Sequence, residues 1–394
     1  MVDCQRGLKG ARLLVGQQDI LAKRVQLCCP APVAPASGEL EAEAIGDTMT
    51  PPHPVNPSFP GLDAEARFAL QSVHDAAQLC STLMTHGQSC RRLDKLDTSP
   101  VTVVDFAVQA LVAQRLEQAF PEATLVAEED SALLRASEAD LAAVAEAVGR
   151  FIPRATPEAV CAWIDRGAGT PRSRFWTLDP IDGTKGLLRG DQYAVALALI
   201  EDGQVLLAAL ACPRLSLEWR PSKNAPGCIL IAGRGQGTWI GADGNRQLRR
   251  LRVSPQASLA QARVLRSFEA AHTDIARLDQ LVDHLGIAAP PLRMDSQVKY
   301  AMLAAGQGEL IFRIPSPVRP GYQERIWDHA AGSLLVQEAG GMVTDLRGAA
   351  LDFGAGRTLR RNVGVLASNG QLHPSALQAI AAVGADRPVG AGPA

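Results

Sequence analysis

The chain has 394 residues, of which 47% are hydrophobic and 20% are charged, and its formal net charge is −2. This length suits one large domain or two closely joined domains with a sizeable core. A net charge so close to zero argues against general binding to nucleic acids or membrane surfaces, and no apolar run approaches the length of a membrane-spanning helix. The cysteines show no C-x-x-C spacing, which favours reduced thiols in a cytosol-like compartment.

Residues 1–60 are rich in proline and show no sustained periodicity, so we expect a mostly disordered N-terminal extension. Five basic residues precede residue 25, as in an organelle transit peptide. Acidic residues interrupt this segment, however, and no Ser or Thr occurs before Pro30, so a dispensable start is an equally good interpretation. We therefore expect a cytoplasmic protein, with a plastid or mitochondrion as the alternative.

Apolar residues at helical spacing predict a helix over residues 63–85. A second helix is predicted from Asp105, which is either its N-cap or a functional carboxylate, and the two uses are compatible. A short apolar strand over 124–127 precedes an acidic triplet that begins at Glu128. Such a triplet is usually a solvated turn, but strand ends are also where α/β proteins gather their ligands.

The same criteria predict further elements: a helix over 133–148, a loop-rich insertion over 153–174, a hairpin of strands over 193–200 and 204–211, and short strands over 228–232 and 237–240. From about residue 251 strands and helices alternate, which indicates an α/β layer arrangement. We therefore divide the chain into an N-terminal α+β domain over 61–250, a C-terminal α/β domain over 251–385 and a tail over 386–394.

The most informative stretch is D-P-I-D-G-T at residues 179–184, which follows an apolar run. Pro180 favours extended geometry at Asp179, so a strand is predicted to end here. Asp182 lies three residues after Asp179, and two such carboxylates can converge on one hard cation. Gly183 permits a tight turn whose N–H groups suit a phosphate. A lone D-x-x-D is usually an acidic surface turn, whereas the whole hexapeptide behind an apolar strand is far more specific.

The stretch I-W-D-H-A-A-G adds Asp328 at a predicted helix start, where taken alone it is most simply an N-cap. Together with Glu128, Asp179 and Asp182 it makes four carboxylates from distant parts of the chain. Four converging carboxylates would repel one another unless cations lay between them. Two or three Mg²⁺ ions would make the cluster a phosphatase centre, in which His329 is a less suitable ligand because Mg²⁺ prefers oxygen.

Four motifs, S-P-V-T-x-x-D, E-E-D, D-P-I-D-G-T and W-D-H-A-A-G, occur in this order between residues 64 and 382. Together they resemble the lithium-sensitive, Mg²⁺-dependent phosphatases of the inositol monophosphatase superfamily. The resemblance implies an α/β (α+β) fold, the layered αβαβα sandwich of the inositol monophosphatases and fructose-1,6-bisphosphatases. Two further stretches, K-G-L-L-R-G-D-Q-Y from Lys185 and D-S-Q-V-K-Y from Asp295, resemble the eukaryotic-type 3′(2′),5′-bisphosphate nucleotidases most closely.

The resemblance implies a set of Mg²⁺ ligands, namely Glu128, Asp179, Asp182, Asp328 and the backbone carbonyl of Ile181. It further implies that Thr184 hydrogen-bonds to Asp105, and that this pair orients and deprotonates the attacking water. The N–H groups of Gly183 and Thr184 would hold the phosphate. Two positions depart from the family, since Ala127 stands where Gly is usual and Leu187 replaces a common Phe, but neither removes a ligand.

For the substrate, the resemblance implies contacts from His272, Ser296, Lys299 and Arg313 to the nucleoside and the 5′-phosphate. A Lys and an Arg that converge on a second phosphate make chemical sense; otherwise Lys299 and Arg313 are exposed charges on a helix and at a strand end. The implied activity is hydrolysis of the 3′-phosphate of adenosine 3′,5′-bisphosphate, and of 3′-phosphoadenylyl sulfate, by a monomer. The alternatives are an inositol polyphosphate 1-phosphatase or inositol monophosphatase, and a non-catalytic nucleotide-binding sensor.

Overall fold

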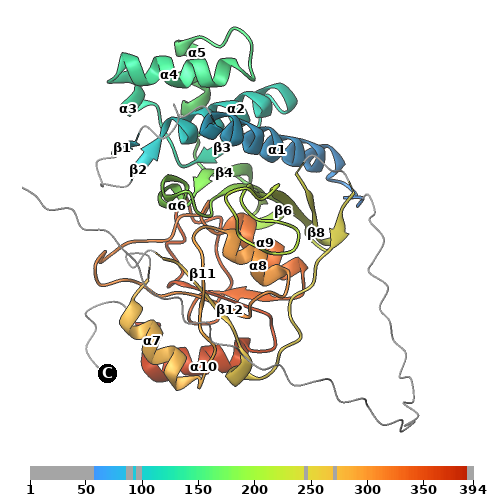
Figure 1. Ribbon diagram of the computed structural model, residues 1–394, viewed down its shortest axis with the longest axis vertical. Helices are drawn as coiled ribbons and strands as arrows, with labels where there is room; N and C mark the ends of the chain where they lie inside the picture. The colour runs from blue at the N-terminus through green and yellow to red at the C-terminus, as the bar shows by residue number, and fades with distance from the viewer. Residues whose placement is uncertain (1–56, 86–91, 95–99, 244–246, 269–272, 388–394) are drawn as a thin grey trace, which may run out of the picture. The chain divides into compact units, whose positions relative to one another are not determined.

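A computed structural model of the protein describes residues 57–85, 92–94, 100–243, 247–268 and 273–387. Most of the predicted N-terminal extension and of the predicted tail, and also His272, lie outside these residues. The described residues all belong to one compact unit that begins at Pro51. Their larger strands form two sheets, and helices cover the faces of both (Figure 1).

The first sheet has seven strands in the order β3-β4-β5-β6-β7-β8-β9. These strands are β3 (Leu125–Ala127), β4 (Arg174–Asp182), β5 (Ala194–Glu201), β6 (Gln204–Cys212), β7 (Cys228–Gly233), β8 (Gly237–Ala242) and β9 (Arg249–Arg250). β3 and β4 are parallel, and each later pair is antiparallel, so the predicted hairpin is confirmed as β5 and β6. Consecutive residues of β4 and β5 are buried on both faces, as expected for strands covered from two sides.

The second sheet has five strands in the order β11-β10-β12-β14-β13. These strands are β10 (Val264–Arg266), β11 (Leu292–Arg293), β12 (Leu310–Arg313), β13 (Met342–Thr344) and β14 (Val365–Ser368). β10 runs parallel to both β11 and β12, whereas β14 is antiparallel to its two neighbours. The chain passes from the first sheet to the second between β9 and β10, and a domain boundary at residue 250 stays a prediction.

Three pairs of helices form layers around these sheets, and further helices pack outside the first of these layers (Figure 1). The described helices are α1 (Asp63–Thr85), α2 (Val103–Ala119), α3 (Ala132–Arg135), α4 (Glu138–Gly149), α5 (Pro157–Asp165), α6 (Thr184–Arg189), α7 (Ile275–His284), α8 (Val298–Ala304), α9 (Ala330–Glu338) and α10 (His373–Val383). α1 and α2 cover the outer face of the first sheet, α8 and α9 lie between the sheets, and α7 and α10 cover the second sheet. This order confirms the predicted αβαβα sandwich.

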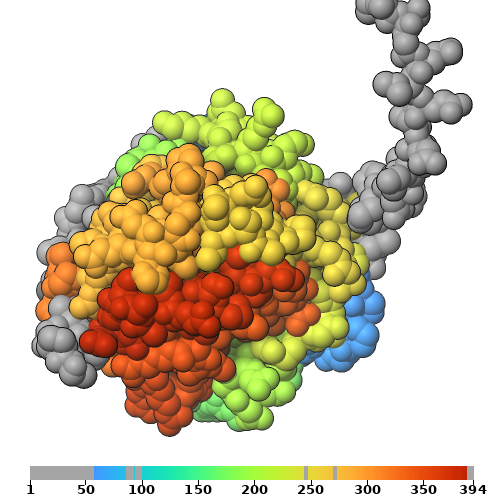
Figure 2. Space-filling view, turned by 90° about the horizontal axis from the view of Figure 1, so that it is seen from below, coloured from blue at the N-terminus to red at the C-terminus, as the bar shows by residue number. Residues whose placement is uncertain are grey.

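Each interface between layers has its own hydrophobic cluster. Phe106 of α2 and Trp176 of β4 belong to the first cluster, and Leu334 of α9 belongs to the second, which fills the space between the sheets. The third cluster joins the second sheet to α7 and α10 through residues such as Leu281 and Ile380. Figure 2 views the molecule from this side, where α7 and α10 form much of the surface.

Two sequence predictions in the first half of the chain were wrong in detail. The helix predicted over 133–148 is divided into α3 and α4, because the Ser137 side chain accepts a hydrogen bond from the Asp140 N–H and so caps a new helix. The insertion predicted to be loop-rich contains α5, which begins after the N-cap Thr156 with proline in its first turn. Residues before the second helix form a small hairpin of β1 (Arg92–Asp94) and β2 (Pro100–Thr102).

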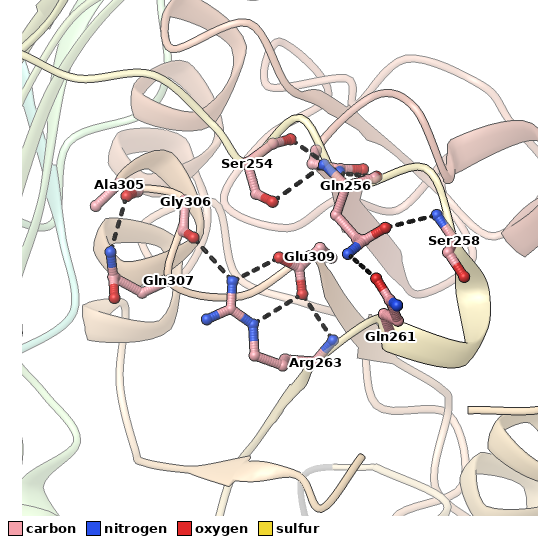
Figure 3. Close-up of polar contacts among 10 residues, drawn as sticks. Ser254, Gln256, Ser258, Gln261, Arg263, Ala305, Gly306, Gln307 and Glu309 are labelled. Atoms are coloured by element: carbon pink, nitrogen blue, oxygen red, sulfur yellow. Dashed lines mark hydrogen bonds and ion pairs between the residues drawn. The ribbon is translucent and has the colours of Figure 1, made fainter. Parts of the chain in front are cut away.

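A partly buried polar network holds the segment that enters the second sheet (Figure 3). Glu309, which precedes β12, accepts hydrogen bonds from the backbone N–H of Arg263 at 2.7 Å and from its guanidinium at 2.7 Å. The same guanidinium donates to the Gly306 carbonyl at 2.9 Å. Because Arg263 precedes β10, the ion pair fixes the register of two strands whose far ends reach the cavity at Ser267 and Arg313.

Within the described ranges, no helix is both long and apolar enough to cross a membrane. The cysteines of this part, Cys80, Cys161, Cys212 and Cys228, are buried free thiols. Cys212 and Cys228 face each other across β6 and β7. Burial raises the pKa of Cys212 well above its usual value, so this thiol stays protonated at neutral pH.

Candidate metal and phosphate site

Four carboxylates that the sequence predicts from separate motifs line one cavity of about 620 Å³. Glu128 directly follows β3, and Asp179 and Asp182 lie in the last four residues of β4. Since β3 and β4 are parallel neighbours, their carboxyl ends meet at one edge of the sheet. Asp328 reaches the same cavity from the turn before α9. The structure therefore brings the four predicted carboxylate ligands together, and Ile181 lines the same cavity.

The end of β4 is irregular, and this irregularity directs both of its carboxylates to the cavity. The strand was predicted to end at Asp179, but it continues to Asp182 with a shift of register between these two residues. In a regular strand, residues three apart point to opposite faces. Pro180 lacks an N–H group and cannot keep the ladder regular, and the resulting bulge re-aims the side chains so that both line the cavity.

The charges in this cavity call for a cation. Burial raises the pKa of Asp179 well above its usual value, and the charges of Glu128, Asp182, Asp328 and Asp105 raise it further. Asp179 Oδ1 is buried and has no hydrogen-bond partner among the described residues. An unpaired buried oxygen surrounded by carboxylates is an unfavourable arrangement for a metal-free protein. The donor set is all oxygen, which fits a hard divalent cation.

Burial disfavours the charged forms of Asp182 and Asp328 as well, although partners in the protein partly offset this for Asp182. Burial raises the pKa of Asp182, while the charge of Lys299 and a hydrogen bond from the Gln297 N–H at 2.6 Å lower it. Burial raises the pKa of Asp328 well above its usual value, as do the charges of Asp182 and Glu128. α9 begins at Ala330, so the alternative that Asp328 is its N-cap is wrong.

Asp105 is likewise not the N-cap of its helix. Thr102 is the N-cap of α2, and Asp105 is the third helical residue of a capping box, with Oδ2 accepting the Thr102 N–H at 2.8 Å. Its other oxygen, Oδ1, lies 3.1 Å from Thr184 Oγ1, as the resemblance implied. Thr184 Oγ1 lies equally close to the carbonyl oxygen of Ile181, so its single proton can go to either acceptor.

The turn after β4, for which phosphate binding was predicted, has an unusual backbone. Gly183 has φ of +89° and precedes α6, and a Cβ on it would lie 3.0 Å from the Cβ of Ser296. Ser296 itself has φ of +66°, which is unusual for a residue with a side chain. Two uncommon backbone conformations thus face each other beside the cavity, and only glycine fits at residue 183.

The predicted substrate residues Ser296, Lys299 and Arg313 line the same cavity. Lys299 is buried, and its Nζ donates to Ser267 Oγ at 3.0 Å and to the Ser296 carbonyl at 2.9 Å. Burial lowers its pKa to about 8, against the opposing charge of Asp182. The alternative that Lys299 and Arg313 are exposed surface charges is therefore wrong.

Sequence reasoning missed Glu324, which holds Arg313 in place. Arg313 Nη2 donates to Glu324 Oε2 at 2.7 Å, and the same oxygen lies 2.9 Å from His329 Nε2. The other ring nitrogen of His329 contacts the Tyr300 hydroxyl at 2.8 Å. Burial alone would raise the pKa of Glu324, but Arg313 and His329 hold it well below its usual value. An acidic residue four positions before Asp328 was the only signal for it in the sequence.

Glu324, Asp328 and His329 also offer ligand atoms that all lie within 4.8 Å of one another. Both nitrogens of His329 are hydrogen-bonded to the protein, and Glu324 is paired with Arg313. This group is therefore an internal polar network in which Asp328 alone remains suited to a metal.

Comparison with known proteins identifies the family. A model of the inositol monophosphatase family matches residues 63–385. The chain belongs to this family. Membership implies metal-dependent catalysis, in agreement with the clustered carboxylates.

Relatives of this family member can be compared over most of the chain. It is 39% identical over 341 residues to a 3′(2′),5′-bisphosphate nucleotidase of Schizosaccharomyces pombe, covering 82% of this chain and 96% of the relative. It is 40% identical over 337 residues to a 3′(2′),5′-bisphosphate nucleotidase of Oryza sativa, covering 80% and 93%. The solved structure of an IMPase from Thermotoga maritima has a TM-score of 0.56 at 22% identity, covering 81% of this chain and 97% of that chain. The last likeness confirms the fold.

The two departures from the family pattern are accommodated by their surroundings. Ala127 pairs in β3, and its N–H donates to the Gly167 carbonyl at 2.8 Å. A Cβ on Gly167 would lie 2.9 Å from the Cβ of Ala127, so glycine at residue 167 leaves room for the alanine. Leu187 is buried in the cluster that joins α1 and α2 to the first sheet, where its apolar side chain still fills the core.

Proposed function

We propose that this protein is a Mg²⁺-dependent phosphatase that releases the 3′-phosphate of adenosine 3′,5′-bisphosphate and leaves AMP. It would also accept 3′-phosphoadenylyl sulfate and leave adenylyl sulfate. The observation that carries the proposal is one cavity with a cluster of carboxylates for cations and, for a second phosphate, the buried Lys299 and the half-buried Arg313. The names of relatives that are similar over most of this chain support the choice of substrate.

Two to three Mg²⁺ ions would be held by the four carboxylates and a backbone carbonyl, namely Glu128, Asp179, Asp182, Asp328 and the carbonyl of Ile181. The unpaired Oδ1 of Asp179 fits this assignment, since a cation would supply the partner that the described residues do not. When bound, the ions would bind phosphate oxygens, lower the pKa of a water and stabilise the leaving alkoxide.

Asp105 and Thr184 would manage the proton of the attacking water. Thr102 fixes one oxygen of Asp105, which leaves Oδ1 directed at the Thr184 hydroxyl. Thr184 Oγ1 can accept a hydrogen bond from a water while it donates its own hydrogen to Asp105. When the water gives its proton to Oγ1, the proton of the hydroxyl passes to the Asp105 carboxylate. The pair therefore orients the water and deprotonates it.

The substrate would be held at its two phosphates. N–H groups of Gly183 and Thr184, at the start of α6, would hold the phosphate that is cleaved. Lys299 and Arg313 would bind the 5′-phosphate through their positive charges, with Glu324 holding one edge of the Arg313 guanidinium in place. Ser296 would contact the nucleoside, and the predicted contact of His272 falls outside the described residues.

The proposal is tested by phosphate release with Mg²⁺ from a matched panel, with and without Li⁺. The panel contains adenosine 3′,5′-bisphosphate, 3′-phosphoadenylyl sulfate, inositol 1,4-bisphosphate, inositol 1-phosphate and fructose 1,6-bisphosphate. We expect a strong, Li⁺-sensitive preference for the two nucleotides. A preference for inositol phosphates would keep the metal site but reject the substrate assignment, and tight nucleotide binding without turnover would favour a sensor.

We also propose that the enzyme acts as a monomer on this small-molecule substrate. In the described part of the chain, the large hydrophobic residues that are exposed are Phe268, Val318, Tyr322 and Met342. Val318 and Tyr322 line the cavity, which accounts for two of them without an interface between subunits. Light scattering after size-exclusion chromatography should give the mass of a single chain.

A further inference from the structure

Arg357 is attached through its backbone to the segment that carries Asp328. Its carbonyl oxygen accepts the Ile326 N–H at 3.2 Å, and the Leu359 N–H donates to the Glu324 carbonyl at 2.8 Å. An isolated antiparallel bridge lies between these two hydrogen bonds. Residues 357–359 and 324–326 therefore form a short two-stranded ladder, and Arg357 is held beside the residues that precede α9.

The side chain of Arg357 crosses to the other half of the metal site. Its Nη1 donates to the Gly167 carbonyl at 3.0 Å, and its Nη2 donates to the carbonyl of Ala127. Ala127 directly precedes Glu128. The guanidinium carbon also lies 4.8 Å from the centroid of the Trp327 ring. Trp327 directly precedes Asp328. One side chain thus contacts the residue immediately before two ligands that lie 200 positions apart in sequence.

Arg357 makes these contacts through the hydrogen-bond donors of its guanidinium and not only through apolar packing. Among the described residues, the hydrogen-bond acceptors of Arg357 are backbone carbonyls and not carboxylates. Burial lowers the pKa of Arg357 and the nearby charge of Arg325 lowers it further, while the charges of Asp130 and Glu128 act in the opposite direction. A partly buried guanidinium that is hydrogen-bonded only to backbone carbonyls is costly, and an apolar side chain would fill the space at less cost. What only a guanidinium provides is several donors in a fixed plane.

The turn at Glu128 has a second anchor that stays within its own half of the molecule. Gln109 of α2 accepts the Glu129 N–H at 2.9 Å and donates to the Glu129 carbonyl at 2.6 Å. Gln109 therefore fixes the turn to the first sheet and its helices. Arg357 contributes a link of another kind, from this turn to the residues before α9.

We propose that Arg357 is a positioning residue that holds the Glu128 turn and the Trp327–Asp328 segment at a fixed separation, so that carboxylates from both can bind the same cations. The inference rests on the proposed function, because it assumes that these carboxylates bind metal. Arg357 then acts through the backbone before Glu128, as residues behind metal ligands commonly do.

The test is calorimetric titration of Mg²⁺ into the protein without substrate, together with melting temperatures in a chelator. In Arg357→Met, Mg²⁺ affinity should fall about 10- to 100-fold, the range seen when residues behind metal ligands are replaced. Arg357→Lys keeps the charge but not the planar fork, and we expect it to restore only part of the affinity. The matched control is Arg361→Met, because Arg361 is 70% exposed and pairs only with Asp352 among the described residues; it should bind Mg²⁺ as the unaltered protein does.

Several outcomes would overturn the inference. Unchanged Mg²⁺ affinity in Arg357→Met, with a lower melting temperature, would make the contact purely structural. Unchanged Mg²⁺ affinity with a raised KM for the nucleotide would make Arg357 a substrate contact. If the unaltered protein binds no Mg²⁺, the proposed function fails as well. If Arg357→Met does not fold, the lysine variant decides: full affinity there would refute the need for a fork of donors.

Discussion

Asp179→Asn should abolish phosphate release and yet stabilise the protein when no metal is present. The pKa of Asp179 is raised in the folded state by burial and by four neighbouring carboxylates. Its folded state therefore binds protons more tightly than its unfolded state, so stability is lost as pH rises from about 4 through the raised pKa. Asparagine has nearly the same shape but does not ionise, so Asp179→Asn does not lose this stability as the pH rises.

The magnitudes follow from the size of the folded unit. At about 2.1 cal per mole per kelvin for each residue, residues 57–387 have an unfolding entropy of about 0.7 kcal/mol per kelvin. Each unit by which the pKa is raised corresponds to about 1.4 kcal/mol, or about 2 °C in melting temperature. Mg²⁺ at a hundred times its Kd should stabilise the unaltered protein by about 2.7 kcal/mol, or about 4 °C.

The assay is thermal unfolding between pH 5 and 8, in a chelator and in Mg²⁺. We expect Asp179→Asn to melt above the unaltered protein in chelator at pH 8, by a margin that shrinks toward pH 5, and to lose its response to Mg²⁺. Asp279→Asn is the control, because Asp279 is an exposed carboxylate paired with Arg266 and should change little. A lower melting temperature for Asp179→Asn in chelator at pH 8, or a normal Mg²⁺ response, would refute the reasoning.

Three further predictions concern residues around the site. Thr184→Val should lower kcat at least 100-fold with little change in melting temperature, since it removes the hydroxyl that relays the proton, a contribution of about 10²–10⁴. Glu324→Gln should lower the free energy of unfolding, measured by urea titration, by about 3 kcal/mol, because it breaks the ion pair with Arg313. It should also raise KM for the bisphosphate, because Arg313 loses its orientation. Gly167→Ala should destabilise by about 1–3 kcal/mol through overpacking, since a Cβ there would lie 2.5 Å from the Gln109 amide.

Each of these has a result that contradicts it. A kcat within a few-fold of normal in Thr184→Val would remove the threonine from proton transfer. An unchanged KM in Glu324→Gln, measured at full folding, would separate Arg313 from the substrate. An unchanged free energy of unfolding in Gly167→Ala would show that the neighbours can move apart; the control is Gly149→Ala, where φ is likewise not positive and a Cβ would meet nothing within 4 Å.

The layered fold was predicted from the resemblance to the family, and the four carboxylates that line one cavity were predicted from local patterns in the sequence. A strand followed at once by carboxylates is a local pattern, and the ends of neighbouring parallel strands share an edge. The sequence could therefore place Glu128 and Asp179 at strand ends, whereas the parallel pairing of these strands is known only from the structure. The order of helices and strands after residue 250 likewise indicated layers, because each element carries its own periodicity.

Residues that act across the molecule gave no such signal. Arg357 lies in a segment without regular structure, and its acceptors, the carbonyls of Ala127 and Gly167, are backbone groups that leave no trace in the sequence. Glu324 pairs with Arg313 eleven positions earlier across two elements. The N-cap of α2 was misplaced because Asp105 and Thr102 are both good caps, and the capping box uses both.

The most direct test of the central proposal follows adenosine 3′,5′-bisphosphate by phosphorus NMR with Mg²⁺. The account predicts that the resonance of the 3′-phosphate disappears while that of the 5′-phosphate remains, with AMP and inorganic phosphate as the products. The variant Asp105→Asn should leave both resonances unchanged over the same time. Loss of the 5′-phosphate, or no change in the nucleotide under conditions in which inositol 1-phosphate is hydrolysed, would contradict it.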